Sequence, residues 1–289
     1  MSQSLSITFL GTGDASGYPH PFCLCENCVE AREVGGKSFR LRSSALINDE
    51  LLIDIGPDLL AASYLQRKPL HDIKYVVQTH PHMDHLEPAQ LEMRTERFGI
   101  TNLPHLEFYG TAASVGRVRD TVLASKRTQH VPAEEVLAAL KLSLHEIAPH
   151  QTFCVGPYEL TAVPASHDAP GVCVLYAISL NGHSIFYGND TGPIADEAWE
   201  TLKAKGISFD IVILDHTFGV REGNAGHMSG AMVVETMARM REYGLLRDGA
   251  RVLGNHIAPH SNPIHEKMAA IAAKSGYEIA YDGLTITLG

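Results

Sequence analysis

A short histidine-rich stretch constrains the chain more than any other feature, because it places four potential metal ligands within six residues: His80, His82, Asp84 and His85. The preceding segment, Ile73–Gln78, has the composition of a β-strand, so His80 and His82 should leave the strand end on the same side and share one ion. Asp84 and His85 follow a turn at the expected start of a helix, from where they can reach a second ion. The alternative is a histidine-rich surface loop, in a chain that contains 16 histidines. The position at a strand end favours a two-metal hydrolytic centre.

The composition is typical of a soluble globular enzyme. The 289 residues are 45% hydrophobic and 19% charged, which suffices for one large domain spanning 1–289 without a linker. The sequence contains neither a run of about 18 apolar residues nor a signal-peptide pattern, so we expect a cytoplasmic protein without a membrane segment. A formal net charge of −10 disfavours generic nucleic-acid binding, because phosphates attract basic surfaces.

Strand-like and helix-like segments alternate along both halves of the chain. The predicted strands are 6–10, 44–48, 51–55, 73–78, 171–178, 184–188, 209–215, 251–256 and 284–288. The predicted helices are 195–205, 231–243 and 264–275, with further helices opening near residues 57 and 88. This alternation by itself indicates an α/β fold.

The ligand stretch matches the pattern H-x-H-x-D-H, and in this the chain resembles the metallo-β-lactamase superfamily. The resemblance implies an αββα sandwich, in which two mixed sheets pack face to face with helices outside. It also implies three more ligands at distant strand ends, which the sequence supplies in order. By the resemblance, His167 is the third ligand of the first metal, Asp190 is the bridging carboxylate and His256 is the last ligand of the second metal.

The two-metal interpretation predicts hydrolysis without an organic cofactor. Two divalent ions about 3.5–4 Å apart, zinc or manganese in the first place, hold a bridging hydroxide and polarise the phosphorus or carbonyl group under attack. Asp84 should ligate the second metal and orient this nucleophile. Asp54, at the end of an earlier strand, either orients a ligand from behind or forms a turn before Gly56.

Three clustered cysteines, Cys23, Cys25 and Cys28, form the pattern C-x-C-x-x-C. In a reducing compartment such thiols favour a structural zinc ion over disulfides, although a chance cysteine-rich loop is the alternative. Cys154 and Cys173 stand apart in apolar surroundings, and we expect both in the core.

The glycine-rich loop 11–17 and these cysteines make the chain similar to the phosphoribosyl 1,2-cyclic phosphate phosphodiesterase subgroup. Members of that subgroup carry a zinc knuckle, and the matching segment of this chain is 23–28. In that subgroup the final histidine pair reads H-x-x-H, whereas His260 lies one residue further from His256. His260, His227 and His20 therefore all stay candidates for the fourth zinc ligand.

A leaving alkoxide needs a proton, and the segments around Asp215 and His227 resemble the acidic residue and H-x-S pair of ribonuclease Z. The resemblance makes His227 the expected general acid with Asp215 as its partner, and His216 is the second candidate. Arg94 and Arg97 either bind a substrate phosphate or are simply solvated.

Three classes of function are compatible with these features. The ligand set and the cysteines favour a phosphodiesterase that acts on a small phosphate diester, cyclic diesters included, by resemblance to the subgroup above. A ribonuclease Z-like nuclease is supported by Asp215, His227 and Ser229, but the acidic charge and the lack of a long basic arm oppose it. A non-hydrolytic accessory protein of the pyrroloquinoline quinone biosynthesis protein B type shares the cysteines, but the intact ligand set opposes it. Ester, lactone or thioester hydrolysis also stays open, as does a homodimer, since proteins of this fold are often dimeric.

Overall fold

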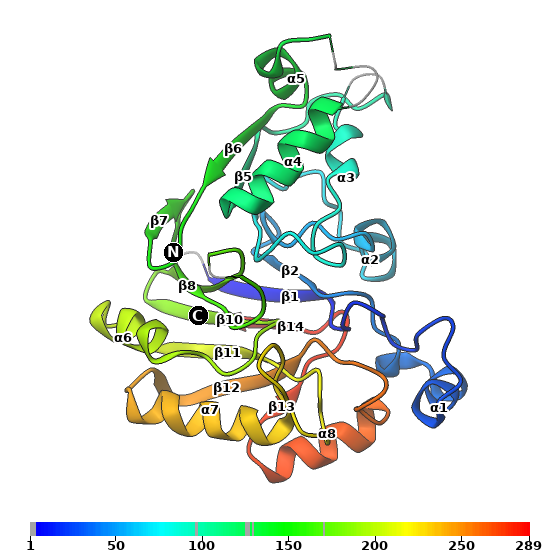
Figure 1. Cartoon of the computed structure of the whole chain (residues 1–289), viewed down its shortest axis with the longest axis vertical. Helices are drawn as coiled ribbons and strands as arrows, with labels where there is room; N and C mark the ends of the chain where they lie inside the picture. Colours follow the sequence, from blue (N-terminus) through cyan, green and yellow to red (C-terminus); the bar gives the residue numbers. More distant parts are fainter. Residues whose placement is uncertain (1–3, 96–97, 125–127, 129, 170) are drawn as a thin grey trace.

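The computed structural model describes residues 4–95, 98–124, 128, 130–169 and 171–289. Over these residues the strands form two seven-stranded sheets, and helices lie on the outer side of each (Figure 1). Both sheets are mixed, since antiparallel and parallel neighbours occur in each. The predicted α/β fold, an αββα sandwich of two mixed sheets, is therefore confirmed.

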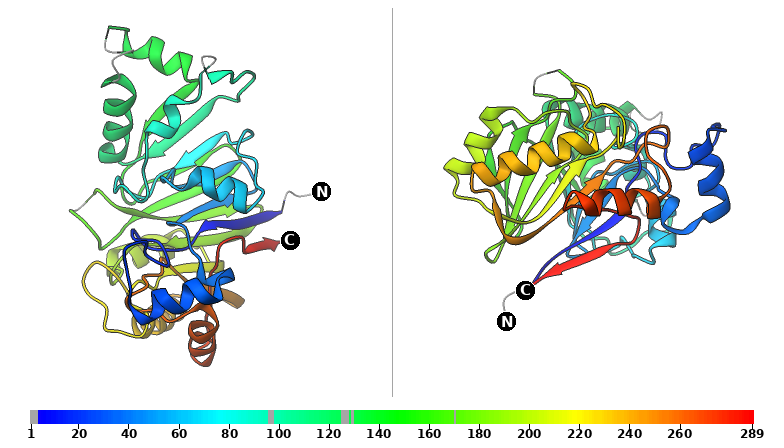
Figure 2. Two further views of the ribbon diagram at one scale, coloured as in Figure 1. Left: turned by 90° about the vertical axis from the view of Figure 1, so that its right-hand side faces the viewer. Right: turned by 90° about the horizontal axis from the view of Figure 1, so that it is seen from below.

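The first sheet is built mainly from the amino-terminal half and is closed at one edge by the last strand of the chain. Its strands, in spatial order, are β14 (Thr285–Leu288), β1 (Leu5–Gly11), β2 (Ser44–Ile47), β3 (Leu51–Ile53), β4 (Tyr75–Val77), β5 (Leu106–Gly110) and β6 (Leu142–Glu146). Because β1 and β14 pair antiparallel, the two ends of the chain lie side by side (Figure 2).

The second sheet is built from the carboxy-terminal half. Its strands, in spatial order, are β13 (Glu278–Ile279), β12 (Leu246–Asn255), β11 (Phe209–Asp215), β10 (His183–Gly188), β9 (Val174–Leu180), β8 (Tyr158–Pro164) and β7 (Thr152–Val155). Strands β10 to β13 run parallel, so their carboxyl ends meet at one edge of the sheet.

Helices cover the outer faces of both sheets (Figure 1). Those on the first sheet are α2 (Leu59–Leu65), α3 (Ala89–Glu92), α4 (Ala112–Ala124) and α5 (Ala133–Ala139). Those on the second sheet are α6 (Asp196–Ala204), α7 (Gly230–Glu242) and α8 (His265–Lys274). The remaining helix, α1 (Glu26–Val34), follows the cysteines at the right of Figure 1, and the 3₁₀ turn Gly36–Ser38 comes after it.

Strand β10 contributes side chains to two core layers, one between the sheets and one under the outer helices. Alternate side chains of a strand point to opposite faces, so Ile185 and Tyr187 enter the core between the sheets, while Phe186 points outward. The Phe186 ring packs against Trp199 of α6, with 6.0 Å between the ring centroids. Because both faces are covered, the three consecutive residues Ile185–Tyr187 are all buried hydrophobic side chains, without a polar residue at alternate positions.

The predicted strands and helices are present, with shifted ends; β12, for example, begins at Leu246 and not at Arg251. Strands β5, β6, β7 and β13 and helices α1, α4 and α5 were not anticipated. The prediction that Cys154 is a core residue is wrong, because it is exposed on the edge strand β7, whereas Cys173 is buried as expected. Among the helices that the structure describes, none combines the length and the apolar character needed to cross a bilayer.

Candidate metal centre

The ligands predicted from the sequence come together just beyond the ends of four strands. His80 and His82 follow β4, His167 follows β8, Asp190 follows β10 and His256 follows β12. Strand ends hold such side chains in place because neighbouring strands fix the backbone, and α/β folds commonly bind ligands there. Both sheets therefore contribute to one site.

The ligand atoms form two adjacent sets, and within each set they all lie within 4.8 Å of one another. The first, which we call the open set, consists of His80, His82 and His167. The second, which we call the buried set, consists of Asp84, His85, Asp190 and His256. All seven residues predicted as ligands of the two catalytic ions belong to these sets.

The Asp190 carboxylate connects the two sets. Its Oδ2 atom lies 3.2 Å from His80 Nε2 in the open set. The same atom lies 3.0 Å from His85 Nε2 and 3.4 Å from His256 Nε2 in the buried set. A carboxylate in this position suits a bridge between two neighbouring ions.

Each of the five histidines also has a ring nitrogen held by a partner outside the sets. Metal-binding histidines are usually oriented in this way, because the outer hydrogen bond fixes the tautomer and the ring. The pairs are His80 Nδ1 with Thr79 Oγ1 at 3.0 Å, His82 Nε2 with Asp168 Oδ2 at 3.2 Å, His85 Nδ1 with Asp54 Oδ2 at 2.8 Å, His167 Nδ1 with the Gly226 carbonyl at 3.1 Å and His256 Nδ1 with Thr217 Oγ1 at 2.9 Å.

The two alternatives for Asp54 are resolved by its contacts. Besides His85, its carboxylate accepts hydrogen bonds from the Thr79 backbone N–H at 2.8 Å and from Gln78 Nε2 at 2.9 Å. It is fully buried and orients a ligand from behind. The sequence alone left this open.

Three residues of the site have a left-handed backbone. Asp54, Asp190 and His256 have φ values of 64°, 56° and 60°. Residues other than glycine rarely adopt this conformation, which costs on the order of 1–3 kcal/mol each and is concentrated at functional sites. The surrounding sheets hold these residues in place against that cost.

The buried set concentrates charge away from water. Burial opposes the charged form of His256, but Asp190, Asp84 and Asp215 outweigh it and raise its pKa to about 9. The pKa of His85 is likewise raised well above its usual value, since Asp54 and its neighbours outweigh burial. Buried carboxylates of this density need compensating positive charge, and bound cations would provide it.

Among the buried polar atoms that lack a hydrogen-bond partner in the described part of the chain, two belong to the ligands. They are His80 Nε2, which faces the open set, and Asp190 Oδ1. Burying such atoms without a partner is costly, and an imidazole nitrogen and a carboxylate oxygen are both good ligands for zinc or manganese. The donor set therefore fits divalent ions.

His227 lies beside these sets, on the loop before α7. Its Nδ1 atom is 3.1 Å from Asp215 Oδ2 and 3.2 Å from Asp190 Oδ1, and the side chain is partly exposed. Gly192 lets this loop approach, because a Cβ atom there would lie 2.0 Å from the Ala225 carbonyl oxygen. The structure thus brings the predicted acid and its partner together.

His216 lies elsewhere, and the hypothesis that it is a second candidate for the acid is not supported. Its Nδ1 atom is paired with Asn262 Oδ1 at 3.0 Å and its Nε2 atom with the Tyr277 hydroxyl at 2.9 Å. The ring is buried at the base of a cavity between α7 and α8, so both nitrogens are engaged away from the ligand sets.

The two arginines proposed to bind phosphate do not gain support either. Arg94 Nη2 donates to the Pro104 carbonyl at 2.7 Å, so its guanidinium is engaged within the protein, and Arg97 lies outside the described residues.

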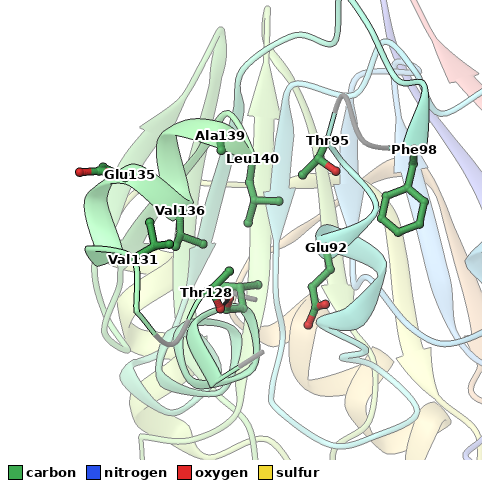
Figure 3. A pocket seen from close by; sticks show the side chains of 10 residues that line it. Glu92, Thr95, Phe98, Thr128, Val131, Glu135, Val136, Ala139 and Leu140 are labelled. Atoms are coloured by element: carbon green, nitrogen blue, oxygen red, sulfur yellow. Dashed lines mark hydrogen bonds between the residues drawn. The ribbon is translucent and has the colours of Figure 1, made fainter. Parts of the chain in front are cut away.

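A nearby cavity of about 280 Å³ between α3, α4 and α5 has mostly apolar walls (Figure 3). None of the predicted ligands is among its lining residues, which include Glu92, Thr95, Phe98, Val131, Val136 and Leu140.

The three clustered cysteines have their thiols within 4.8 Å of one another, apart from the site above. Arg32 closes their loop, because its guanidinium donates to the carbonyl oxygens of Cys23 and Cys28. In the described part of the chain, no histidine or carboxylate joins this group at that distance. Of the three candidates for the fourth zinc ligand, His20 belongs to the same loop as the cysteines. His260 is exposed and packs near Phe218. His227 lies with Asp190, Asp215 and His256.

Several functional neighbours were missed from the sequence, namely Thr79, Asp168, Thr217 and Gly226. The first two adjoin the ligands His80 and His167 in the chain, so adjacency was an available signal. Thr217 contacts Asp215, His227 and His256 at once, and only the fold brings those residues together.

Comparison with models of known protein families identifies the superfamily of the chain. A family model described as a β-lactamase superfamily domain matches residues 49–257. The chain belongs to this superfamily. The match covers all seven residues of the open and buried sets and extends over both halves of the fold, and members of this metallo-β-lactamase superfamily are typically hydrolases. No curated protein sequence matches the chain significantly.

Many solved structures share the fold, among them three with informative names. A diphosphatase of the PhnP family is 22% identical with a TM-score of 0.73, over 100% of this chain and 98% of that one. Zn²⁺-bound PqqB from Methylobacterium extorquens is 21% identical with a TM-score of 0.72, over 98% of this chain and 100% of that one. The short form of human tRNase Z is 17% identical with a TM-score of 0.64, over 98% of this chain and 99% of that one. At these identities the likeness concerns the fold.

Proposed function

We propose that the protein is a dinuclear metal-dependent phosphodiesterase that hydrolyses a small phosphate diester, cyclic diesters included. The observation that carries the proposal is the position of Asp190, whose carboxylate lies within 3.4 Å of histidines from both ligand sets. A site for one ion would not need a carboxylate shared in this way.

The ligand sets define what bound metals would contribute. Divalent ions, zinc or manganese, would supply Lewis acidity toward the phosphorus centre and lower the pKa of a water molecule toward 7. Asp84, whose Oδ2 atom is 3.1 Å from His85 Nε2, also orients the attacking water.

His227 is the residue that gives a proton to the leaving oxygen. Its Nδ1 atom faces Asp215, so Nε2 is the nitrogen that remains for the substrate. The Asp215 carboxylate is held by the backbone N–H groups of Thr217 and Met228, at 2.9 and 3.0 Å, and so keeps the imidazole in place. A phosphodiester with a poor leaving group benefits most from such an acid.

The substrate class separates this proposal from its alternatives. The similarity to a PhnP-family diphosphatase supports a small phosphate substrate. A ribonuclease Z-like activity would use the same Asp215 and His227 pair, but the net charge of −10 opposes a large polyanionic partner. PqqB shares the fold to the same degree, but the two complete ligand sets favour a hydrolytic role over a non-hydrolytic one. The proposed partner is therefore a small molecule, and a homodimer is the assembly to test.

We further propose that the protein is cytoplasmic and that Cys23, Cys25 and Cys28 hold one structural zinc ion. Their grouped thiols suit zinc, which takes four sulfur or nitrogen ligands. His20, on the same loop, and His260 are the candidates for the fourth ligand.

The proposal is tested by purifying the protein, measuring its metal content and offering a substrate panel. The panel contains an aryl phosphodiester, its monoester, cyclic phosphates, nucleotide diesters, precursor transfer RNA and lactones. We expect metal-dependent hydrolysis of diesters and little action on the monoester. Preferential cleavage of the transfer RNA or of lactones would contradict the proposed substrate class.

A further inference from the structure

His82 differs from the other predicted ligands in its exposure. Its side chain is 42% exposed, whereas those of His80, His85 and His256 are at most 2% exposed. It lies on the segment between β4 and α3, after Pro81, which has no N–H to offer as a donor. The buried core therefore does little to fix the imidazole ring of His82, although its backbone carbonyl accepts the Leu86 N–H at 2.8 Å.

Asp168 holds the His82 ring from one side. Its Oδ2 atom lies 3.2 Å from His82 Nε2, which leaves Nδ1 facing His167 Nε2 at 3.2 Å. The carboxylate is itself fixed, because its Oδ1 atom accepts the Ala169 backbone N–H at 2.7 Å. The contact thereby selects which ring nitrogen of His82 faces the open set.

Arg117 holds the backbone from the other side. From helix α4 its Nη1 atom donates a hydrogen bond to the carbonyl oxygen of Pro81, the residue between His80 and His82. Helix α4 is a firm base, because Val115 and Val118 are fully buried in the core under the first sheet. Among the described residues Arg117 forms no ion pair with a carboxylate, and its guanidinium instead bonds the Pro81 carbonyl.

We propose that Asp168 and Arg117 are positioning residues for His82 and that together they set the affinity of the open set for its metal ion. Asp168 fixes the ring and Arg117 fixes the loop. The inference rests on the proposed metal centre, but not on the identity of the substrate or of the reaction.

The test is a titration of metal-free protein with Co²⁺ or Zn²⁺, followed by absorption spectroscopy and calorimetry. In Asp168→Ala the affinity for one of the two catalytic ions should fall roughly 10–100-fold, the range known for residues behind metal-binding histidines. Asp168→Asn should lose less, because its amide oxygen can still accept from His82. Arg117→Met should weaken the same ion, and Arg117→Lys should lose less because it keeps a donor.

Matched controls come from helix α4. Asp120→Ala and Arg119→Met remove the same charges from exposed positions of the same helix and should bind both ions as the unmodified protein does. In a His82→Ala background, Asp168→Ala should add no further loss of affinity, since its effect passes through His82.

Unchanged affinity in both Asp168→Ala and Arg117→Met, with melting temperatures intact, would overturn the inference. So would an equal loss of affinity for Asp168→Ala with and without His82. Because the readout is metal binding, a protein that binds two ions but cleaves no diester would end the proposed function and leave this inference standing.

Discussion

The open set consists of three histidines and the buried set of two histidines and two aspartates, and the two sets differ in their exposure to solvent. Every side chain of the buried set is at most 7% exposed, and its ligands are backed by Asp54 and Thr217 in the interior. The open set relies on His82 and on a carboxylate, Asp168, that is 43% exposed. The interior of the fold therefore organises the buried set, while contacts near the surface hold His82 of the open set.

The largest expected effect comes from removing the connection between the sets. Asp190→Asn keeps a side chain that tolerates the left-handed backbone but loses the carboxylate charge. We expect loss of metal from both sets and a fall in diester hydrolysis beyond the roughly 10–100-fold typical of residues behind the ligands. Metal content and rates would be measured on the same sample. If only one ion were lost, the carboxylate would not be shared.

The next effect concerns the acid beside the sets. His227→Ala should slow hydrolysis of an alkyl diester by roughly 10²–10⁴-fold, because general acid catalysis is lost, and should slow an aryl diester far less. Rates on the two substrates are compared at equal metal content. Similar losses on both substrates, or loss of bound metal, would make His227 a ligand or an orienting residue.

The difference in burial between the two sets can be tested at the carboxylates that orient their histidines, Asp54 behind the buried set and Asp168 behind the open set. Asp54→Ala leaves the buried backbone N–H of Thr79 without a partner, at a cost of about 1–3 kcal/mol, and removes one of the acceptors of Gln78 Nε2, so it should lower both metal affinity and melting temperature. Asp168→Ala should lower affinity alone, because its carboxylate is exposed. Thermal melts of metal-free protein measure this difference. Equal melting temperatures would mean that burial does not distinguish the sets.

A smaller effect is expected at the cysteines, which form a third cluster apart from both sets. Cys25→Ser should release one tightly bound zinc ion and lower the melting temperature, since a structural zinc ion contributes folding free energy. The catalytic ions and the hydrolytic rate per folded molecule should persist. Cys154→Ser, at an exposed cysteine outside the cluster, is the control. Unchanged zinc content would return the cysteines to a chance loop.

The sequence predicted what local patterns encode. The stretch from His80 to His85 indicated a metal centre by itself, whereas His167, Asp190 and His256 were assigned by the resemblance to the superfamily, which places ligands at strand ends. Helix α4 was missed although its buried residues Val115, Val118 and Val122 follow the helical spacing, because alanine, glycine and serine make the rest of the segment weakly apolar.

Contacts between distant segments could not be predicted in the same way. His82 meets Asp168 across 86 residues, and His216 turns toward Tyr277 and away from the site although it adjoins Asp215. Side-chain direction at a strand end depends on the neighbouring strands, which no local pattern specifies.

The central claim, catalysis by two ions in two unequal sets, is tested most directly by adding metal stepwise to metal-free protein and following hydrolysis of an aryl phosphodiester. Cys25→Ser is the suitable background, because the cysteine cluster then takes up no ion. We predict that the rate stays low through the first equivalent, which fills the buried set, and rises through the second, which fills the open set. Full activity in metal-free protein, or a maximal rate at one equivalent, would contradict the account.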